Sequence, residues 1–140
     1  MPEPSFDIAY IALGSNLGDR AGYLSRARSA LAALPGSRVL AESSIEETMP
    51  VGPVEQGPFL NQMVALETTL SPTDLLRELQ TIEKREGRER TVRWGPRTLD
   101  LDIVRFDRQT VNDAALKVPH PELHNRDFWQ RELAELGVPT

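Results

Sequence analysis

Two aspartates on alternate residues, Asp100 and Asp102, follow a run of arginines in the second half of the chain. If this stretch is a strand, both carboxylates lie on one face, about 7 Å apart at the backbone, while Leu99, Leu101 and Ile103 point to the other face. Mg²⁺ is usually held by one or two carboxylates together with substrate phosphates and water. The pair is therefore a candidate site for magnesium bound with a polyphosphate, although an isolated Asp-x-Asp more often marks two solvated side chains.

The basic side chains around this pair favour the phosphate interpretation. From residue 84 to residue 105 the sequence carries a net charge of +3, whereas the whole chain carries −5. Arginine grips phosphate oxygens with two parallel N–H groups, and such local charge reversal attracts an anionic ligand. The alternative is a solvated helix end with surface ion pairs. A Gly95-Pro96 turn favours a defined site, because it fixes where the neighbouring side chains point. The basic residues are Lys84, Arg85, Arg88, Arg90, Arg93, Arg97 and Arg105.

Composition predicts one globular domain spanning residues 1–140. The chain is 39% hydrophobic and 26% charged, which is typical of a soluble protein. It has no cysteine, so disulfides and thiolate metal sites are excluded. We find no secretory signal and no apolar run long enough for a membrane span. We therefore expect a cytoplasmic protein that binds neither membrane nor, given its net acidity, nucleic acid. A monomer is the expected oligomeric state, although no feature of the sequence determines it.

Hydrophobic periodicity predicts four strands and three helices. The order β-α-β-β-α-β is typical of an α+β, ferredoxin-like fold, an antiparallel sheet with helices packed on one face, here followed by a short C-terminal helix. That scaffold serves many functions, so it settles none of them. The predicted strands cover residues 6–13, 38–47, 59–70 and 99–106, and the predicted helices cover residues 20–34, 72–86 and 126–136.

Two of these elements carry further candidate site residues. On the strand from residue 59, alternation places Phe59 and Asn61 on one face and Leu60 and Val64 on the other. Near the end of the helix 72–86, Gln80 and Glu83 lie three residues apart and precede the arginine-rich loop. Glu83 could contact a nucleotide, orient an arginine, or simply be solvated.

Four sequence blocks then carry a specific resemblance. They resemble, in the same order, the motifs of the 6-hydroxymethyl-7,8-dihydropterin pyrophosphokinase family of folate biosynthesis. The resemblance covers roughly residues 8 to 128, and its most specific block is the decapeptide RWGPRTLDLD. The blocks are Tyr10 to Gly18 (YIALGSNLG), Phe59 to Gln62 (FLNQ), Arg93 to Asp102 (RWGPRTLDLD) and Val118 to Pro121 (VPHP).

The resemblance implies a magnesium-dependent diphosphotransferase. Such an enzyme transfers the β,γ-diphosphate of ATP to the hydroxymethyl oxygen of the pterin and releases AMP. The implied catalytic residues are Arg97, Asp100 and Asp102, with two Mg²⁺ ions held by the two aspartates. The positions implied for ATP are Gln80, Glu83, Arg90, Arg93, Arg97, Ile103, His120 and Arg126, with Lys117 in place of a basic residue that is usual near Ala115. The positions implied for the pterin are Thr48, Val51, Gly52, Phe59, Asn61, Trp94 and Phe128.

The chemistry of the pterin suits this assignment. A flat heterocycle with hydrogen-bonding edges can stack between Phe59 and Phe128 while the Asn61 amide reads its edge. Without the resemblance, both aromatic side chains would be taken as core residues. The Gly- and Pro-rich loops 48–58 and 87–94 are predicted lids.

The chain departs from the family pattern in three places, and two other functions stay open. The basic residue near Ala115 is missing, Met49 stands where proline is common, and the familiar Pro-Leu and Ile-Ala-Pro segment after Phe128 is replaced by an amphipathic stretch. One alternative is an RNA-binding module that uses the arginines as a phosphate grip and Phe59 and Trp94 for stacking. The other is a catalytically weakened relative that binds ATP and pterin without turnover.

Overall fold

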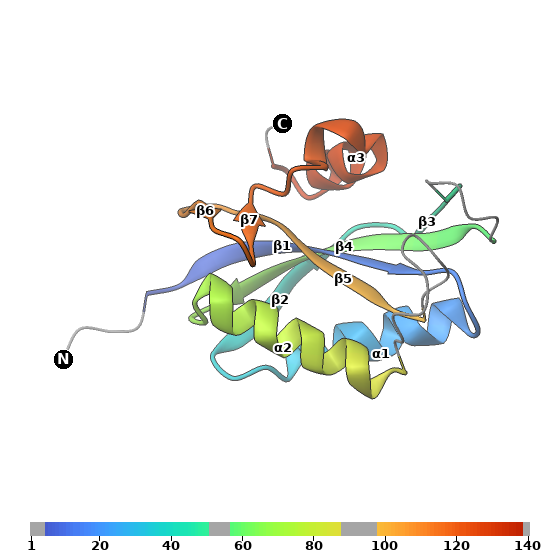
Figure 1. The fold of residues 1–140 in the computed structure, drawn as a ribbon, viewed down its shortest axis with the longest axis horizontal. Coiled ribbons are helices and arrows are strands. Elements are labelled where there is room, and N and C mark those ends of the chain that lie inside the picture. Colours follow the sequence, from blue (N-terminus) through green and yellow to red (C-terminus); the bar gives the residue numbers. More distant parts are fainter. Residues whose placement is uncertain (1–4, 51–56, 88–97, 139–140) are drawn as a thin grey trace.

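A computed structural model describes residues 5–50, 57–87 and 98–138. It contains a five-stranded antiparallel sheet in which the strand order is β2-β4-β1-β5 and β3 also pairs with β4. Helices α1 and α2 lie on one side of the sheet and α3 lies on the other (Figure 1). The expected α+β, ferredoxin-like order is confirmed. The elements are β1 (Asp7–Ser15), α1 (Arg20–Ala32), β2 (Ser37–Glu42), β3 (Glu46–Thr48), β4 (Phe59–Thr68), α2 (Pro72–Arg85), β5 (Asp100–Phe106), β6 (Val111–Asn112), β7 (Lys117–Val118), a 3-10 turn (Leu123–Asn125) and α3 (Asp127–Glu135).

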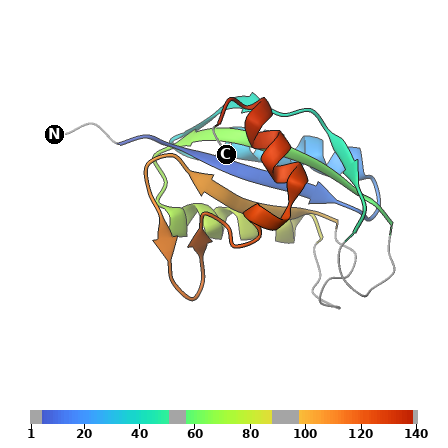
Figure 2. The same ribbon diagram turned by 90° about the horizontal axis from the view of Figure 1, so that it is seen from above.

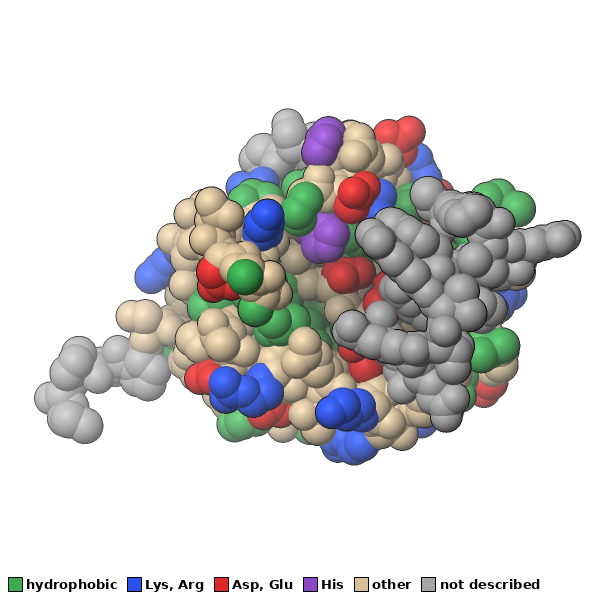
Figure 3. Space-filling view, viewed as in Figure 1, with side chains coloured by type: hydrophobic (Ala, Val, Ile, Leu, Met, Phe, Trp, Pro, Cys, Tyr) green, Lys and Arg blue, Asp and Glu red, His purple; other side chains and the backbone are tan. Residues whose placement is uncertain are grey.

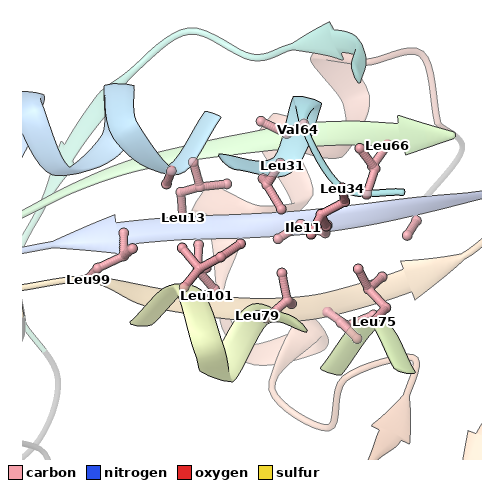
Figure 4. Packing of buried hydrophobic residues seen from close by; sticks show 14 of the residues in the cluster. Ile11, Leu13, Leu31, Leu34, Val64, Leu66, Leu75, Leu79, Leu99 and Leu101 are labelled. Carbon is pink, nitrogen blue, oxygen red and sulfur yellow. The ribbon is translucent and has the colours of Figure 1, made fainter. Parts of the chain in front are cut away.

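The main core lies between the sheet and helices α1 and α2. Alternate residues of β1, such as Ile11 and Leu13, meet Leu31 of α1 and Leu79 of α2 in one apolar layer (Figure 4). Leu101 of β5 belongs to the same layer, as the alternation in the sequence predicted. This layer fixes which face of β5 is buried, and it therefore also fixes the direction of the two aspartates.

The helix boundaries follow from capping chemistry. The Ser71 side chain accepts a hydrogen bond from the Asp74 backbone N–H at 3.1 Å, and Pro72 occupies the first turn of α2. Gly87 follows the end of α2 with φ of 81°, a conformation that favours glycine. The Asp19 side chain caps α1 in the same way by accepting from the Gly22 N–H at 3.1 Å. These local signals mark the start of α1 and both ends of α2, and all three predicted helices are correct to within two residues.

The C-terminal helix α3 crosses the opposite face of the sheet (Figure 2). Its side chains Trp129 and Leu133 pack with Tyr10 and Met63 in a second apolar cluster. This explains why β1 reads as a continuous apolar run, since both of its faces are covered. Within the described residues, none of the helices has the length and apolarity needed to cross a bilayer.

The predicted strand 38–47 is wrong in its continuity, because it is two strands. Glu42 pairs with Val64 and Glu46 pairs with Asn61, so three residues on this side oppose two on β4. At the break, the Ser43 hydroxyl accepts the Met63 N–H at 2.8 Å. A side chain thus replaces a backbone partner, and just after the break the Ser44 N–H donates to Glu135 Oε1 of α3 at 2.7 Å. The small β6-β7 hairpin was also missed, because its two-residue strands are too short for a periodic signal.

Candidate functional site

The pairing of the strands places a candidate metal ligand and a candidate pterin ligand in one row across the sheet. Asp100 of β5 pairs with Gly14 of β1, Gly14 pairs with Asn61 of β4, and Asn61 pairs with Glu46 of β3. Register partners in a sheet point to the same face. The row therefore joins a predicted metal ligand to a predicted pterin ligand across one glycine, on the face that α3 partly covers.

The alternation predicted for β5 is confirmed. Asp100 and Asp102 are half-buried, whereas Leu101 and Ile103 are buried between the sheet and helices α1 and α2. The Ile103 side chain is only 3% exposed, so any contact of this residue with a ligand would be made by its backbone. Asp102 pairs with Ala12, whose small side chain leaves the carboxylate room on this face.

The donor set of the pair fits a divalent cation that is shared with a substrate. Carboxylate oxygens are hard ligands of the kind that Mg²⁺ prefers. Within the described residues, no group of three acidic, histidine or cysteine side chains is placed to hold a metal ion. Two carboxylates alone leave most coordination positions to phosphates and water, which is the usual arrangement for magnesium nucleotide sites.

His120 lies beside the aspartate pair and is held in one orientation. Its backbone N–H donates to the Val104 carbonyl at 2.8 Å, and its Nδ1 accepts the Glu122 N–H at 3.1 Å. Because Nδ1 is an acceptor, the neutral ring carries its proton on Nε2, which lies 3.7 Å from Asp102 Oδ1. Burial, helped by the positive charge of Arg126, lowers the pKa of His120. Figure 3 shows acidic side chains close to a histidine on the surface between α3 and α2.

The start of α3 supplies two more of the predicted residues. The guanidinium carbon of Arg126 lies 4.4 Å from the ring centroid of Trp129. The ring of the half-buried Phe128 packs edge to face against the same indole, with the ring centroids 6.1 Å apart. Trp129 is 2% exposed and anchors this end of the helix in the apolar cluster. The stretch that replaces the familiar segment after Phe128 therefore forms a packed helix next to the site.

The predicted pterin residues of β3 and β4 lie together. Thr48 pairs with Phe59, and the Asn61 amide donates from Nδ2 to Thr48 Oγ1 at 2.5 Å. A methyl group built on Gly14 would lie 3.4 Å from Asn61 Oδ1 and 3.5 Å from the Phe59 ring. Because Gly14 has no side chain, the sheet surface beside Asn61 and Phe59 stays open.

Glu83 takes a place that the sequence interpretation did not foresee. It is buried, and its Oε2 accepts the backbone N–H of Leu101 at 2.8 Å. A signal was available, because Glu83 falls one turn after Leu79 on the buried stripe of α2. Gln80, by contrast, is exposed.

The remaining predicted residues are either exposed or lie outside the described part of the chain. Lys117 is exposed on β7, and Ala115 is exposed in the turn of the β6-β7 hairpin. Most of the two predicted lids also falls outside the described residues. The predicted site residues there are Val51, Gly52, Arg90, Arg93, Trp94 and Arg97.

Comparisons with known proteins show which family this chain resembles. The chain matches the model of the family described as 7,8-dihydro-6-hydroxymethylpterin-pyrophosphokinase over residues 10–138. It is 49% identical over 130 residues to the 2-amino-4-hydroxy-6-hydroxymethyldihydropteridine pyrophosphokinase of Bacillus subtilis, covering 93% of this chain and 78% of the relative. It is 46% identical over 128 residues to the protein of the same name from Pseudomonas aeruginosa, covering 91% and 79%.

A longer relative matches as well. The chain is 41% identical over 130 residues to the folic acid synthesis protein fol1 of Schizosaccharomyces pombe, which covers 93% of this chain and 18% of that protein. The residues matched by the family model include Gly14, Asn61 and Asp100, which form the row across the sheet. The chain belongs to the 7,8-dihydro-6-hydroxymethylpterin-pyrophosphokinase family.

Proposed function

We propose that this protein transfers the β,γ-diphosphate of ATP to the hydroxymethyl oxygen of 6-hydroxymethyl-7,8-dihydropterin and releases AMP, as a step in folate biosynthesis. The observation that carries the proposal is the row that sets Asp100 and Asn61 on one face of the sheet, on either side of Gly14. One end of this row suits a metal-bound phosphate, and the other suits a polar heterocycle. The family relationship supports the same reaction.

The pterin half of the site follows from Phe59, Asn61 and Thr48. The Thr48 hydroxyl accepts a hydrogen bond from the Asn61 amide, which fixes the orientation of that amide. The Oδ1 atom of Asn61 then faces the open sheet surface at Gly14. An acceptor held in this way suits the N–H groups along a pterin edge. Phe59 and Phe128 are the proposed stacking partners, and the proposed contacts from outside the described residues are Val51, Gly52 and Trp94.

The ATP half is proposed to be built on Asp100 and Asp102. Two Mg²⁺ ions bound there would neutralise phosphate charge and align the β-phosphorus with the pterin alcohol. The guanidiniums of Arg90, Arg93, Arg97 and Arg126 are proposed to hold the remaining phosphate oxygens, together with Lys117. The neutral His120 is proposed to donate from Nε2, and Gln80 is proposed to contact the nucleotide from the exposed face of α2.

Catalysis in this arrangement rests on positioning and charge. The alcohol oxygen forms a bond to the β-phosphorus as the bond from that phosphorus to the AMP oxygen breaks, and the alcohol proton leaves to solvent. Phosphoryl transfer gives a protein little covalent work, so aligning the two substrates can supply most of the acceleration. We assign no general base.

The test is AMP formation by the purified protein with ATP and Mg²⁺, measured with and without 6-hydroxymethyl-7,8-dihydropterin. We expect AMP only when the pterin is present, and none with a 6-methyl analogue that lacks the attacking hydroxyl. Saturable binding of both ligands without AMP would identify the catalytically weakened relative. Binding of neither ligand would refute the proposal. The RNA-binding alternative is not favoured by the family relationship.

A further inference from the structure

β5, the strand that carries Asp100 and Asp102, lies at one edge of the main sheet. β5 is the last strand in the order of the main sheet, so its outer backbone groups do not face another strand of that order. Two long-range hydrogen bonds reach this edge. Glu83 Oε2 accepts the Leu101 N–H at 2.8 Å, and the Val104 carbonyl accepts the His120 N–H at 2.8 Å. The two bonds flank Asp102.

The position of Glu83 is unusual for a glutamate of an amphipathic helix. It is only 5% exposed and lies on the same face of α2 as Leu75, Leu79 and Ile82. Burying a carboxylate is unfavourable unless the carboxylate is hydrogen-bonded, and a bond from a backbone N–H to a charged acceptor is among the stronger ones. The packing of α2 therefore holds the Glu83 carboxylate in place. The carboxylate in turn restrains the backbone N–H that donates to it.

That group belongs to the residue between the two aspartates. The Leu101 side chain is packed in the core, and its N–H is held by Glu83, so this residue is restrained at both its side chain and its backbone. The side chains of Asp100 and Asp102 leave the backbone on either side of it and point to the opposite face. Any relaxation at Leu101 changes the distance and angle between the two carboxylates.

We propose that Glu83 is a positioning residue of the metal site, which acts through the Leu101 N–H to hold Asp100 and Asp102 at the geometry that a divalent cation needs. The proposal rests on the proposed function, and it gives the Oε2 atom of Glu83 the role of supporting the metal ligands. Mg²⁺ requires near-octahedral geometry, so its affinity is sensitive to small displacements of its ligands. Loss of such supporting groups typically weakens metal binding 10- to 100-fold.

Two substitutions of Glu83 distinguish its role as a hydrogen-bond acceptor from the role of its negative charge. Glu83→Gln keeps an oxygen that can accept the Leu101 N–H, whereas Glu83→Leu keeps the apolar packing and removes the acceptor. Glu78→Leu, a change of a half-buried glutamate on the same helix, is the matched control. All three variants are first compared with the wild type by thermal unfolding.

Three measurements follow. Amide hydrogen exchange reports whether the Leu101 N–H is still protected. Mn²⁺ titration monitored by electron paramagnetic resonance, in the presence of a non-hydrolysable ATP analogue, reports metal affinity. Calorimetric titration of ATP in EDTA reports nucleotide affinity without metal. None of these measurements requires turnover or pterin, so they stand even if the assay for pterin-dependent AMP fails.

For Glu83→Leu we expect faster exchange at Leu101, Mn²⁺ affinity about tenfold weaker, and metal-free ATP affinity within about twofold of wild type. For Glu83→Gln we expect retained protection of Leu101 and Mn²⁺ affinity within about threefold of wild type. The Glu78→Leu control should leave all three readouts unchanged.

A different pattern would overturn the proposal. If both variants weaken metal-free ATP binding equally while Leu101 stays protected, Glu83 is a nucleotide contact. If Glu83→Leu does not fold, Glu83→Gln alone decides, because a folded variant with a protected Leu101 amide and tenfold weaker Mn²⁺ binding would contradict a role through the Leu101 N–H.

Discussion

The indole ring of Trp129 meets the imidazole ring of His120 edge to face, with the ring centroids 4.9 Å apart. The same indole lies under the Arg126 guanidinium. One buried side chain of α3 thus supports two residues that we propose to contact ATP. The C-terminal helix is therefore linked to the nucleotide half of the site through packing contacts.

Replacing Trp129 with phenylalanine should weaken ATP binding while preserving the fold. The smaller ring loses part of the contact with His120 and most of the stacking under Arg126, contacts that are worth about 0.5–1.5 kcal/mol each. We expect the KM for ATP to rise about three- to tenfold with little change in the KM for pterin, measured by steady-state AMP formation. Leu133→Met alters the same apolar cluster one helical turn further along α3 without changing either ring, and an equal rise in that control would show a general effect of α3 packing.

A side chain added at Gly14 should obstruct the pterin half of the site selectively. A methyl group there meets Asn61 and Phe59 at ordinary contact distances, so Gly14→Ala should fold normally. The alanine side chain would cover the sheet surface next to Asn61 Oδ1, and the valine side chain of Gly14→Val would cover more of that surface. We expect pterin affinity, measured by calorimetry, to fall about threefold for alanine and more than tenfold for valine. Metal-free ATP affinity in the same variants is the internal control, and a parallel loss there would contradict the assignment.

The sequence predicted local features of this site well and long-range ones poorly. Alternation around Leu101 predicted correctly that Asp100 and Asp102 share a face, because strand periodicity is a local property. The pairing of Gly14 with both Asp100 and Asn61 depends on register between distant strands, which no periodicity encodes.

Two further differences have the same origin. Ser43 interrupts a strand because its hydroxyl replaces a backbone partner of Met63, a contact between residues 20 positions apart. The sequence leaves three roles open for Glu83, which are contact with a nucleotide, orientation of an arginine and solvation, because its partner, the Leu101 N–H, lies on another element. Residue type alone cannot distinguish a glutamate that faces solvent from one that accepts a buried backbone N–H.

The hydroxyl of Thr48 should matter for pterin binding through Asn61. Thr48→Val keeps the shape of the side chain and removes the acceptor for Asn61 Nδ2, so the amide loses its fixed orientation. We expect the KM for pterin to rise about three- to tenfold and the KM for ATP to stay unchanged. Thr48→Ser retains the hydroxyl and should behave nearly as the wild type. If serine is as impaired as valine, the methyl group and not the hydrogen bond is the important feature.

Removing one carboxylate of the aspartate pair should abolish turnover without abolishing pterin binding. Asp102→Asn keeps the size of the side chain but lowers its affinity for a divalent cation, and we expect kcat to fall by at least about 100-fold. Pterin affinity, measured by fluorescence titration, should stay within about threefold of wild type. Asp107→Asn, an exposed aspartate just beyond β5 that accepts the Tyr10 hydroxyl, is the control and should leave kcat unchanged. Wild-type turnover in Asp102→Asn would remove the metal assignment.

The buried carboxyl of Glu132 should make the fold less stable as pH rises. Glu132 is 2% exposed, and neither of its side-chain oxygens has a hydrogen-bond partner among the residues that the structure describes. Burial raises the pKa of Glu132 to about 8, and the carboxylates of Glu46 on β3 and Glu135 on α3 add to the shift, which Arg131 opposes. The folded protein therefore keeps a proton on this carboxyl over a range of pH in which the unfolded chain has lost it.

The sign of the pH effect follows from this difference. Between about pH 4.5, the ordinary pKa of the group, and about pH 8, the folded state binds more protons than the unfolded state. The contribution of Glu132 to the free energy of unfolding must then fall as pH rises, by at most about 1.4 kcal/mol per pH unit. Glu132→Leu removes the titrating group and adds an apolar side chain to the cluster around Leu133, so it should stabilise the protein more at pH 8 than at pH 5.

Urea unfolding of the wild type and Glu132→Leu at several pH values measures this directly, because subtracting the two curves cancels the other titrating groups. Asp127→Asn, which removes an exposed acid from the same helix, should give a difference that hardly changes with pH. A constant difference for Glu132→Leu would mean that its carboxyl ionises in the folded state at its ordinary pKa. Since both oxygens are buried without a partner among the described residues, that result would mean that the ionised carboxylate gains water or a hydrogen-bond donor in the folded protein.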